Sequence, residues 1–318
     1  MTDRQISSKR ARILADVAEM YYLEGKDQAA IALKVGVSRS MVSRLLTEAR
    51  KRGIVEIKVN RPIHWDADLE EAIRTRFGIE SVFVVSMEDM KLQKMTINLG
   101  QAAAEKLKEH LRADLIIGVA WGTAVSATVD AVQTMVEPSI KVVQLVGAQG
   151  AKNVEYDGHA IVQRLAEKLN GEGYYLNAPY LCMTPEIAQS MRKTRGIKET
   201  IEMGKDCHIA LLGIGTTETK YSSLYLSGSF TEKELEVFRK NGVVGDIASN
   251  YFKIDGTPYH DDFLNRLITI NHEDLTHIPI RIGIAGGMVK VNSIIGALNS
   301  RLVTHLVTDS ITAKKIVK

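Results

Sequence analysis

Apolar residues near the start of the chain recur at the spacing of an α-helix. From Arg10 to Tyr22 they fall at Ile13, Val17 and Tyr21, which lie four positions apart and therefore on one helix face. Gly25 follows as a break. The pattern predicts a first helix with one buried face.

Two more helices follow, separated by a glycine turn. The segment 28–35 predicts a short second helix, and Gly36 supplies the turn. Ser38 is a natural N-cap for a third helix. After it, apolar residues recur at i, i+3, i+4 and i+7, namely Val42, Leu45, Leu46 and Ala49. The order of elements predicts a helix-turn-helix whose last helix is amphipathic.

The outer face of this third helix carries short hydroxyl groups beside guanidinium groups. Arginine pairs bidentately with guanine in the major groove, and Ser or Thr reaches phosphates or base edges. We expect DNA contacts from Gln28, Ser38, Arg39, Ser40, Ser43 and Arg44. The alternation from Val55 to Val59 predicts a strand that could form a wing. A three-helix packing unit with a solvated basic face is the alternative.

The charge distribution favours a polyanionic partner for this first part. Residues 1–62 hold 13 Lys and Arg against 7 Asp and Glu, a net charge of +6, whereas the whole chain carries +3. The remainder therefore carries −3. A basic module joined to a mildly acidic body predicts double-stranded DNA as a partner of the module.

A break in the pattern near position 60 predicts a domain boundary. The segment 60–63 contains Pro62, which fixes its own backbone and restrains the preceding residue. We expect a DNA-binding domain over 1–60 and an effector-binding and oligomerisation domain over 61–318. A helix over 66–77 opens the second domain, and Gly78 ends it.

The second domain alternates short apolar runs with helical stretches. Continuous apolar strands separated by helices predict a parallel sheet that is covered on both faces, and hence a doubly wound α/β fold of the Rossmann-like type. The predicted strands lie within 82–85, 115–119, 142–146, 209–213, 280–284 and 303–307.

Several of these runs lead into turns rich in glycine and small polar residues. The turns occupy 118–123, 147–150, 213–217 and 285–287. They would lie at the carboxyl ends of parallel strands, where ligands bind in open α/β sheets. Free backbone N–H groups at a glycine turn before a helix suit a phosphate. The sequence therefore predicts an anionic small molecule as the ligand.

Three charged residues near these turns are candidate ligand contacts. Lys290 is expected in the first turn of the helix after Gly287, where its ammonium could neutralise a phosphate or carboxylate. Asp246 follows a glycine in an apolar stretch, so it needs a partner and could accept sugar hydroxyls. Asp157 precedes a helix and is more simply a cap.

Composition excludes several other classes of protein. Apolar residues at 45% and charged residues at 25% are typical of globular proteins. Neither an apolar leader nor a run long enough to span a membrane is apparent, which predicts a cytoplasmic protein. Cys182 and Cys207 suggest neither a disulfide nor a zinc site, and Glu218 interrupts a dinucleotide-binding pattern. We therefore expect no metal and no cofactor.

The motifs of both parts resemble the SorC family of bacterial regulators. In the first part the resemblance rests on 28–50, including Val35-Gly36-Val37-Ser38-Arg39. In the second part it extends from about 66 to 318 through Gly118-Val119-Ala120-Trp121-Gly122-Thr123, Val243-Val244-Gly245-Asp246-Ile247 and Ala285-Gly286-Gly287-Met288-Val289-Lys290. The segments 142–145 and 201–205 are similar to the deoxyribonucleoside-regulator branch.

This resemblance implies a sheet related to sugar-phosphate isomerases, a phosphosugar effector and DNA-binding tetramers. By matching position it assigns effector contacts to Gly122, Thr123, Asp157, Asp246 and Lys290. Two positions depart from the family pattern. Ala124 stands where the family has a second threonine, and Val146 stands where the deoxyribonucleoside branch has a lysine that bonds to the sugar aldehyde. Valine cannot form an imine, which puts covalent capture in doubt.

We therefore predict a DNA-binding transcription regulator, a repressor of a carbohydrate or nucleoside operon, rather than an enzyme. One alternative is a sugar-phosphate isomerase-like enzyme that carries a DNA-binding module. Against it, no convincing pair of nucleophile and base lies near the glycine turns, and His208 is more simply a strand-edge residue than a general base. Another alternative, an architectural DNA-binding protein, leaves the large second domain without a role.

Overall fold

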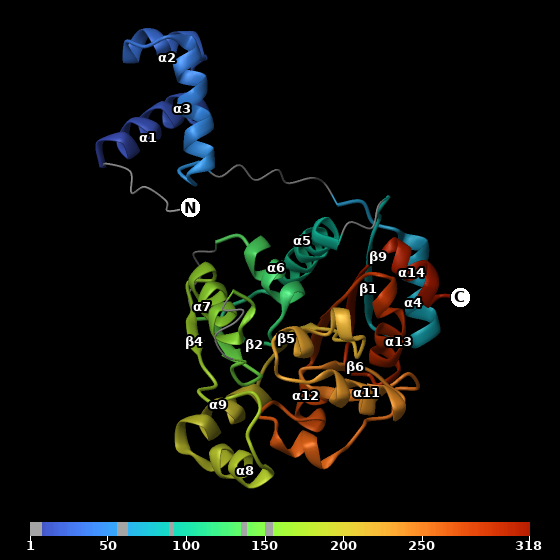
Figure 1. Ribbon diagram of the computed structural model, residues 1–318. Coiled ribbons are helices and arrows are strands. Elements are labelled where there is room, and N and C mark those ends of the chain that lie inside the picture. The colour runs from blue at the N-terminus through green and yellow to red at the C-terminus, as the bar shows by residue number, and fades with distance from the viewer. Residues whose placement is uncertain (1–7, 56–62, 89–91, 135–138, 150–154) are drawn as a thin grey trace. The chain divides into compact units, whose positions relative to one another are not determined.

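The computed structural model describes residues 8–55, 63–88, 92–134, 139–149 and 155–318 (Figure 1). Its contacts divide the chain into two compact units, Met1–Pro62 and Ile63–Lys318. Each unit has its own hydrophobic core.

The first unit is a helix-turn-helix. It contains α1 (Ser8–Tyr22), α2 (Gln28–Val35) and α3 (Arg39–Lys51). Gly36 ends α2 in the left-handed region at φ 73°, and the Ser38 hydroxyl caps α3 by accepting from the Met41 N–H at 3.2 Å. The three predicted helices are confirmed. The predicted wing strand falls largely on 56–62, outside the described residues.

The core of this unit joins one face of each helix. Its fully buried residues include Leu14 and Val17 from α1, Ile31 from α2, and Val42 and Leu46 from α3. The apolar face of α3 is therefore the predicted one. In α1 the centre of the buried face is Leu14 rather than Ile13, which is only half-buried.

The second unit is built on a seven-stranded parallel sheet. Its spatial order is β1-β9-β8-β5-β2-β3-β4, and every neighbouring pair runs parallel. The strands are β1 (Ser81–Val85), β2 (Ile116–Val119), β3 (Lys141–Gln144), β4 (Glu172–Tyr174), β5 (Ile209–Gly213), β8 (Ile280–Ile284) and β9 (His305–Asp309). All six predicted strands are confirmed, with β4 added at the edge.

Helices cover both faces of the sheet, as a doubly wound fold requires. One face packs against α5 (Leu92–His110), α6 (Thr123–Ala131) and α7 (Gly158–Lys168). The other packs against α4 (Ala67–Phe77), α9 (Arg195–Lys205), α11 (Glu232–Lys240), α12 (His272–His277), α13 (Val291–Asn299) and α14 (Ser310–Ile316). Strand residues alternate between these layers, so that Leu211 joins the first and Leu212 the second.

The direction of winding reverses between two neighbouring strands. From β2 the chain winds outward through β3 to the edge strand β4, and it then returns to place β5 beside β2. From β5 it winds the opposite way through β8 to β9. The segments that leave β2 and β5 therefore go to opposite faces, and a crevice forms at the carboxyl ends of these strands.

A β-hairpin that the sequence did not reveal adjoins this crevice. It consists of β6 (Val243–Ile247) and β7 (Asn250–Lys253), paired antiparallel. Its two-residue turn places Ala248 and Ser249 at φ 46° and 64°. Such turns usually carry Asn or Gly, so the usual signal for a hairpin is missing here.

A buried aspartate holds the turn that follows β8. The Asp309 carboxylate caps α14 by accepting from the Thr312 N–H at 2.8 Å, and it accepts from the Gly287 N–H at 3.0 Å. The Thr312 hydroxyl donates to the same carboxylate at 2.6 Å. The end of β9 thereby fixes the backbone of the 285–287 turn.

We predict that Asp309→Asn destabilises the chain by about 1–3 kcal/mol, because an amide nitrogen would face N–H and hydroxyl donors in a buried position. The free energy of unfolding from urea titration measures this. Asp206→Asn is the control, since Asp206 is exposed and should change stability by no more than about 0.5 kcal/mol. Equal stability of the two variants would contradict the role given to Asp309.

Candidate effector site and DNA-binding face

The exposed face of α3 holds the predicted DNA contacts. Arg39, Ser40, Ser43 and Arg44 are all exposed, whereas Gln28 at the start of α2 is half-buried. Glu48, on the same helix, pairs with Arg10 at 2.6 Å and with Arg52 at 2.8 Å. The carboxylate of Glu48 is thus paired with two arginines of the same unit, Arg10 from α1 and Arg52 at the end of α3.

One predicted DNA contact in this unit, Ser38, also has a structural role. The Ser38 hydroxyl caps α3, and it also lies 2.9 Å from the Ser40 hydroxyl. Loss of Ser38 would therefore weaken the start of α3 as well as any DNA contact. Arg39 and Arg44 are the better candidates for direct recognition.

In the second unit, Gly122 and Thr123 form the start of α6 at the carboxyl end of β2. Gly122 is the N-cap residue, with φ 122° and ψ 167°, and no described side chain caps this helix. By contrast, Asp66, Thr184, Thr231 and Asp309 cap α4, α8, α11 and α14 with their side chains. An uncapped helix start at the end of a parallel strand is suited to an anion.

Asp246 lies against the turn that leaves β5. The Gly215 N–H donates to the Asp246 carbonyl at 2.8 Å. A Cβ on Gly215 would lie 2.0 Å from the Asp246 carboxylate oxygen Oδ1, so only glycine leaves room for this side chain. The carboxylate also accepts from the Ser249 N–H at 3.1 Å, across the hairpin turn. Asp246 is therefore a hairpin residue and not a helix cap.

Lys290 reaches the same turn from the other side. Its ammonium donates to the Ile214 carbonyl at 2.6 Å. The residue lies in a 3₁₀ turn, Met288–Lys290, that precedes α13, which corrects the expectation of a place inside the first turn of the helix. The side chain is only partly exposed and sits within electrostatic range of Asp246.

Burial shifts the pKa values of this pair toward each other. It raises the pKa of Asp246 from 3.8 to about 6, against the opposing effects of the Ser249 N–H and of Lys290. It lowers the pKa of Lys290, against the opposing charge of Asp246. Both charges are therefore only partly compensated in the protein, and each can take a further polar partner.

Asp157 is a helix cap, as its simpler reading predicted. Its carboxylate accepts from the His159 N–H at 3.0 Å and from the Gln149 N–H at 2.9 Å. The second bond ties the start of α7 to the loop after β3. Gly122 also approaches this region, because its N–H donates to the Tyr156 carbonyl at 3.1 Å. Asp157 thus belongs to the wall of the same edge.

The site contains buried aromatic residues that are not among the predicted ligand contacts. Tyr180 is 1% exposed, and its ring centroid lies 6.1 Å from that of Trp121, the residue before Gly122. The Ser249 hydroxyl donates to the Tyr180 hydroxyl at 3.0 Å. Tyr251 is also buried, and burial raises its pKa, with further contributions from the neighbouring Tyr180 and Asp246. These side chains form a polar network beneath Asp246.

The position that departs from the deoxyribonucleoside branch is buried. Val146 is 1% exposed and pairs with Thr269, and its carbonyl accepts from the Gln144 side-chain amide at 2.7 Å. Ala124 lies in the first turn of α6, where it offers its backbone but no hydroxyl.

His208 lies at the opposite end of the sheet from these residues. Its Nδ1 accepts from the Ile116 N–H at 3.1 Å, at the amino ends of β2 and β5. This confirms it as a strand-edge residue.

Within the described ranges, no helix is both long and apolar enough to cross a membrane.

Comparisons with known proteins agree with this arrangement. A family model described as "Putative sugar-binding domain" matches residues 61–318. The deoxyribonucleoside regulator of Bacillus subtilis is 30% identical over 309 residues, which cover 97% of this chain and 98% of the relative. The chain belongs to the SorC family of sugar-binding transcription regulators.

Further relatives of this SorC-family regulator cover nearly the whole chain. The sorbitol operon regulator of Klebsiella pneumoniae is 27% identical over 314 residues, covering 98% of this chain and 99% of that protein. The crystal structure of full-length SorC from the same organism has a TM-score of 0.76 at 26% identity and covers 99% of this chain and 100% of its own. The predicted family, fold class and general function are confirmed: the protein is a sugar-responsive, DNA-binding regulator.

The raised pKa of Asp246 makes stability depend on pH in a defined direction. The folded state holds this proton more tightly than the unfolded state, so the contribution is fully present below pH 3.8 and is lost as the pH rises through about 6. Without ligand, we predict that Asp246→Asn raises the free energy of unfolding at pH 7 by about 1–3 kcal/mol.

The measurement is urea denaturation of both forms at pH 7 and near pH 4. The difference between them should shrink at the lower pH, where the wild-type carboxyl is also neutral. A variant that is less stable than wild type at pH 7 would show instead that the carboxylate is well compensated.

Proposed function

We propose that this regulator is a repressor whose effector is a phosphorylated sugar, bound at the carboxyl ends of β2, β5 and β8. The observation that carries the proposal is the convergence of an uncapped helix start with a partly compensated Asp–Lys pair at the reversal of winding. Binding occurs without turnover of the sugar.

The phosphate has two sources of positive potential. The first-turn N–H groups of α6, from Thr123 onward, carry the positive end of the helix dipole. Lys290 supplies a full charge from the turn after β8, and its hydrogen bond to the Ile214 carbonyl holds it in place. Together they favour a dianionic group over a neutral sugar.

The sugar hydroxyls have a carboxylate to donate to. One carboxylate oxygen of Asp246 accepts a hydrogen bond from the Ser249 N–H, and the other lies beside Gly215 at the turn after β5. Hydroxyl donors would replace the water that burial removes from this carboxylate. Asp157 contributes to the site indirectly, because its carboxylate accepts from the Gln149 N–H and thereby holds the loop after β3 in place.

The DNA partner is a palindromic operator contacted by paired copies of α3. Arg39 and Arg44 reach base edges, and the hydroxyls of Ser40 and Ser43 reach phosphates or base edges. We propose a homo-oligomer, because palindromic sites require at least two recognition helices in fixed register, and a tetramer in particular, because the resemblance to the family implies one. The effector acts by favouring one arrangement of subunits.

Phosphorylated sugars should raise the melting temperature of the protein, and their unphosphorylated counterparts should not. At a ligand concentration about 100 times the dissociation constant the stabilisation is about 2.7 kcal/mol. Lys290→Met should weaken phosphosugar binding at least about tenfold, because the anion loses its charged partner. Lys314→Met, on the exposed side of α14, is the matched control. A panel without any response would refute the phosphosugar assignment.

Arg44→Ala should weaken specific operator binding by about 10- to 100-fold and leave the phosphosugar thermal shift unchanged. Titration of labelled operator DNA at fixed salt concentration measures operator affinity, and the phosphosugar thermal shift measures effector binding. Arg50→Ala removes the same charge from the last turn of α3 and should have a smaller effect on specificity. Equal loss of DNA and ligand binding in Arg44→Ala would exclude this division of labour.

A further inference from the structure

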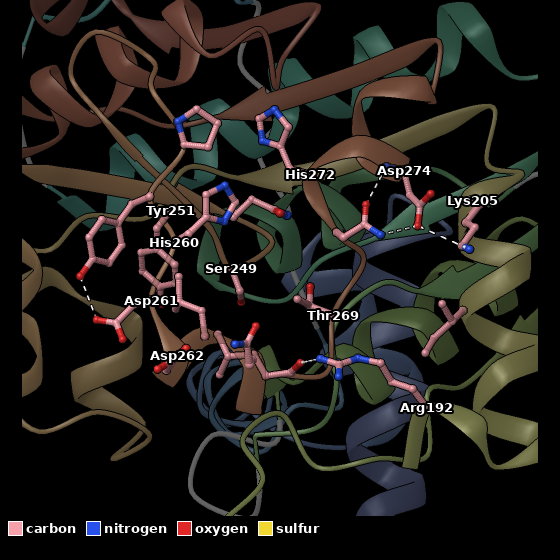
Figure 2. Close-up of a pocket in the computed structure, with 18 of the residues that line it drawn as sticks. Arg192, Lys205, Ser249, Tyr251, His260, Asp261, Asp262, Thr269, His272 and Asp274 are labelled. Carbon is pink, nitrogen blue, oxygen red and sulfur yellow. Dashed lines mark hydrogen bonds and ion pairs between the residues drawn. The ribbon is translucent and has the colours of Figure 1, made fainter. Parts of the chain in front are cut away.

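A groove of about 810 Å³ opens on the second unit, between walls of opposite charge. It is lined by α8 (Pro185–Lys193), α9, the 3₁₀ helix Asp262–Arg266 and α12, with residues of the β6–β7 hairpin at its floor. Figure 2 shows Arg192 and Lys205 on one side and Asp261 and Asp262 on the other, with Ser249 and Thr269 between them.

The charges on the two rims are not neutralised across the groove. Lys205 pairs with Glu202 and Asp274 on its own side, at 3.1 and 3.6 Å. Lys193 and Lys198 are exposed, and neither forms an ion pair with any other residue that the structure describes. On the opposite rim Asp262 is exposed as well. The first rim therefore keeps a net positive charge, because Arg192, Lys193 and Lys198 remain after Lys205 is neutralised, and the opposite rim keeps a net negative charge from Asp261 and Asp262.

The basic rim continues into exposed apolar side chains. Met183 lies just before α8 and Ile187 lies in its first turn, and their side chains are 83% and 44% exposed. The same helix ends in Arg192 and Lys193, which belong to the basic rim. Large apolar side chains beside a charged rim are typical of a protein interface. A small ligand would need a more enclosed site and would leave these side chains in water.

We propose that this groove is the surface on which a second copy of the chain docks. A two-fold axis brings the basic rim of each copy onto the acidic rim of the other, so that one surface with two opposite rims is complementary to itself. The inference rests on the self-assembly proposed above and names the surface that performs it.

The floor of the groove connects this interface to the effector site. Ser249, Asn250 and Tyr251 line the groove, and the Ser249 N–H is held by the Asp246 carboxylate at 3.1 Å. The Ser249 hydroxyl also contacts Tyr180, which lies beside Trp121. A sugar that engages Asp246 thus acts on a hairpin whose turn lines the subunit interface.

The test uses two full-length variants of opposite charge. Lys193→Glu/Lys198→Glu makes both rims acidic, and Asp262→Lys/Asn265→Lys makes the acidic rim basic; all four positions are exposed. In sedimentation velocity each variant alone should associate at least about tenfold more weakly than wild type, because like charges face each other. An equimolar mixture should associate again, because every rim then meets its opposite.

Lys314→Glu/Lys315→Glu makes the same charge change on α14, outside the groove, and should associate like wild type. Circular dichroism and the phosphosugar thermal shift show whether each variant is folded. Variants that associate like wild type, or a mixture that fails to recover, overturn the groove as the interface and leave the effector proposal standing. A wild-type chain that is monomeric at all concentrations overturns the proposed self-assembly itself. Stabilisation by inorganic phosphate that Lys193→Glu/Lys198→Glu abolishes, with sedimentation unchanged, would assign the groove to a small anion.

Discussion

The site depends on one constraint, which is the reversal of winding between β2 and β5. Parallel strands need crossover connections, and right-handed crossovers that run in opposite directions place their helices on opposite faces of the sheet. Between β2 and β5, in the middle of the sheet, the departing segments separate to opposite faces. Gly122 leaves on one side and the 213–217 turn on the other, so backbone groups and side chains from distant parts of the chain converge there.

This position has an energetic consequence for the charges that occupy it. Burial raises the pKa of Asp246 and lowers that of Lys290, so each group is less stable in its charged form than it is in water. The two charges offset each other only in part. A ligand that brings an anion to Lys290 and hydroxyl donors to Asp246 would supply the missing partners. Such a ligand would stabilise the folded protein through partners that the protein itself does not provide, and this is the relation that a sensor needs.

The sequence predicted the parts of the molecule that follow from periodicity and position. Apolar runs that are buried on both faces identified six strands, and the α3 pattern identified the recognition helix, because burial imposes both patterns directly. β4 was missed because it has three residues at the sheet edge, and the hairpin because Ala248 and Ser249 adopt left-handed φ values without the usual residues. Tyr180 could not be selected, since it reaches the site from the irregular segment between β4 and α8. The bond from Lys290 to the Ile214 carbonyl likewise depends on tertiary packing alone.

The hairpin is the element through which the proposed ligand and the proposed interface influence each other. Asp246 contacts the β5 turn on one side, and three residues later Ser249 lines the groove on the other. Because the Asp246 carboxylate holds the Ser249 N–H, a hydroxyl that competes for that carboxylate changes the geometry of the hairpin turn. Thermodynamic coupling is reciprocal, so a sugar that shifts self-association by some factor must bind the assembled and separate forms with affinities that differ by the same factor. A coupling of this kind requires that the sugar bind two arrangements of the turn with different free energies, and the Asp246–Ser249 hydrogen bond is the contact through which those arrangements can differ.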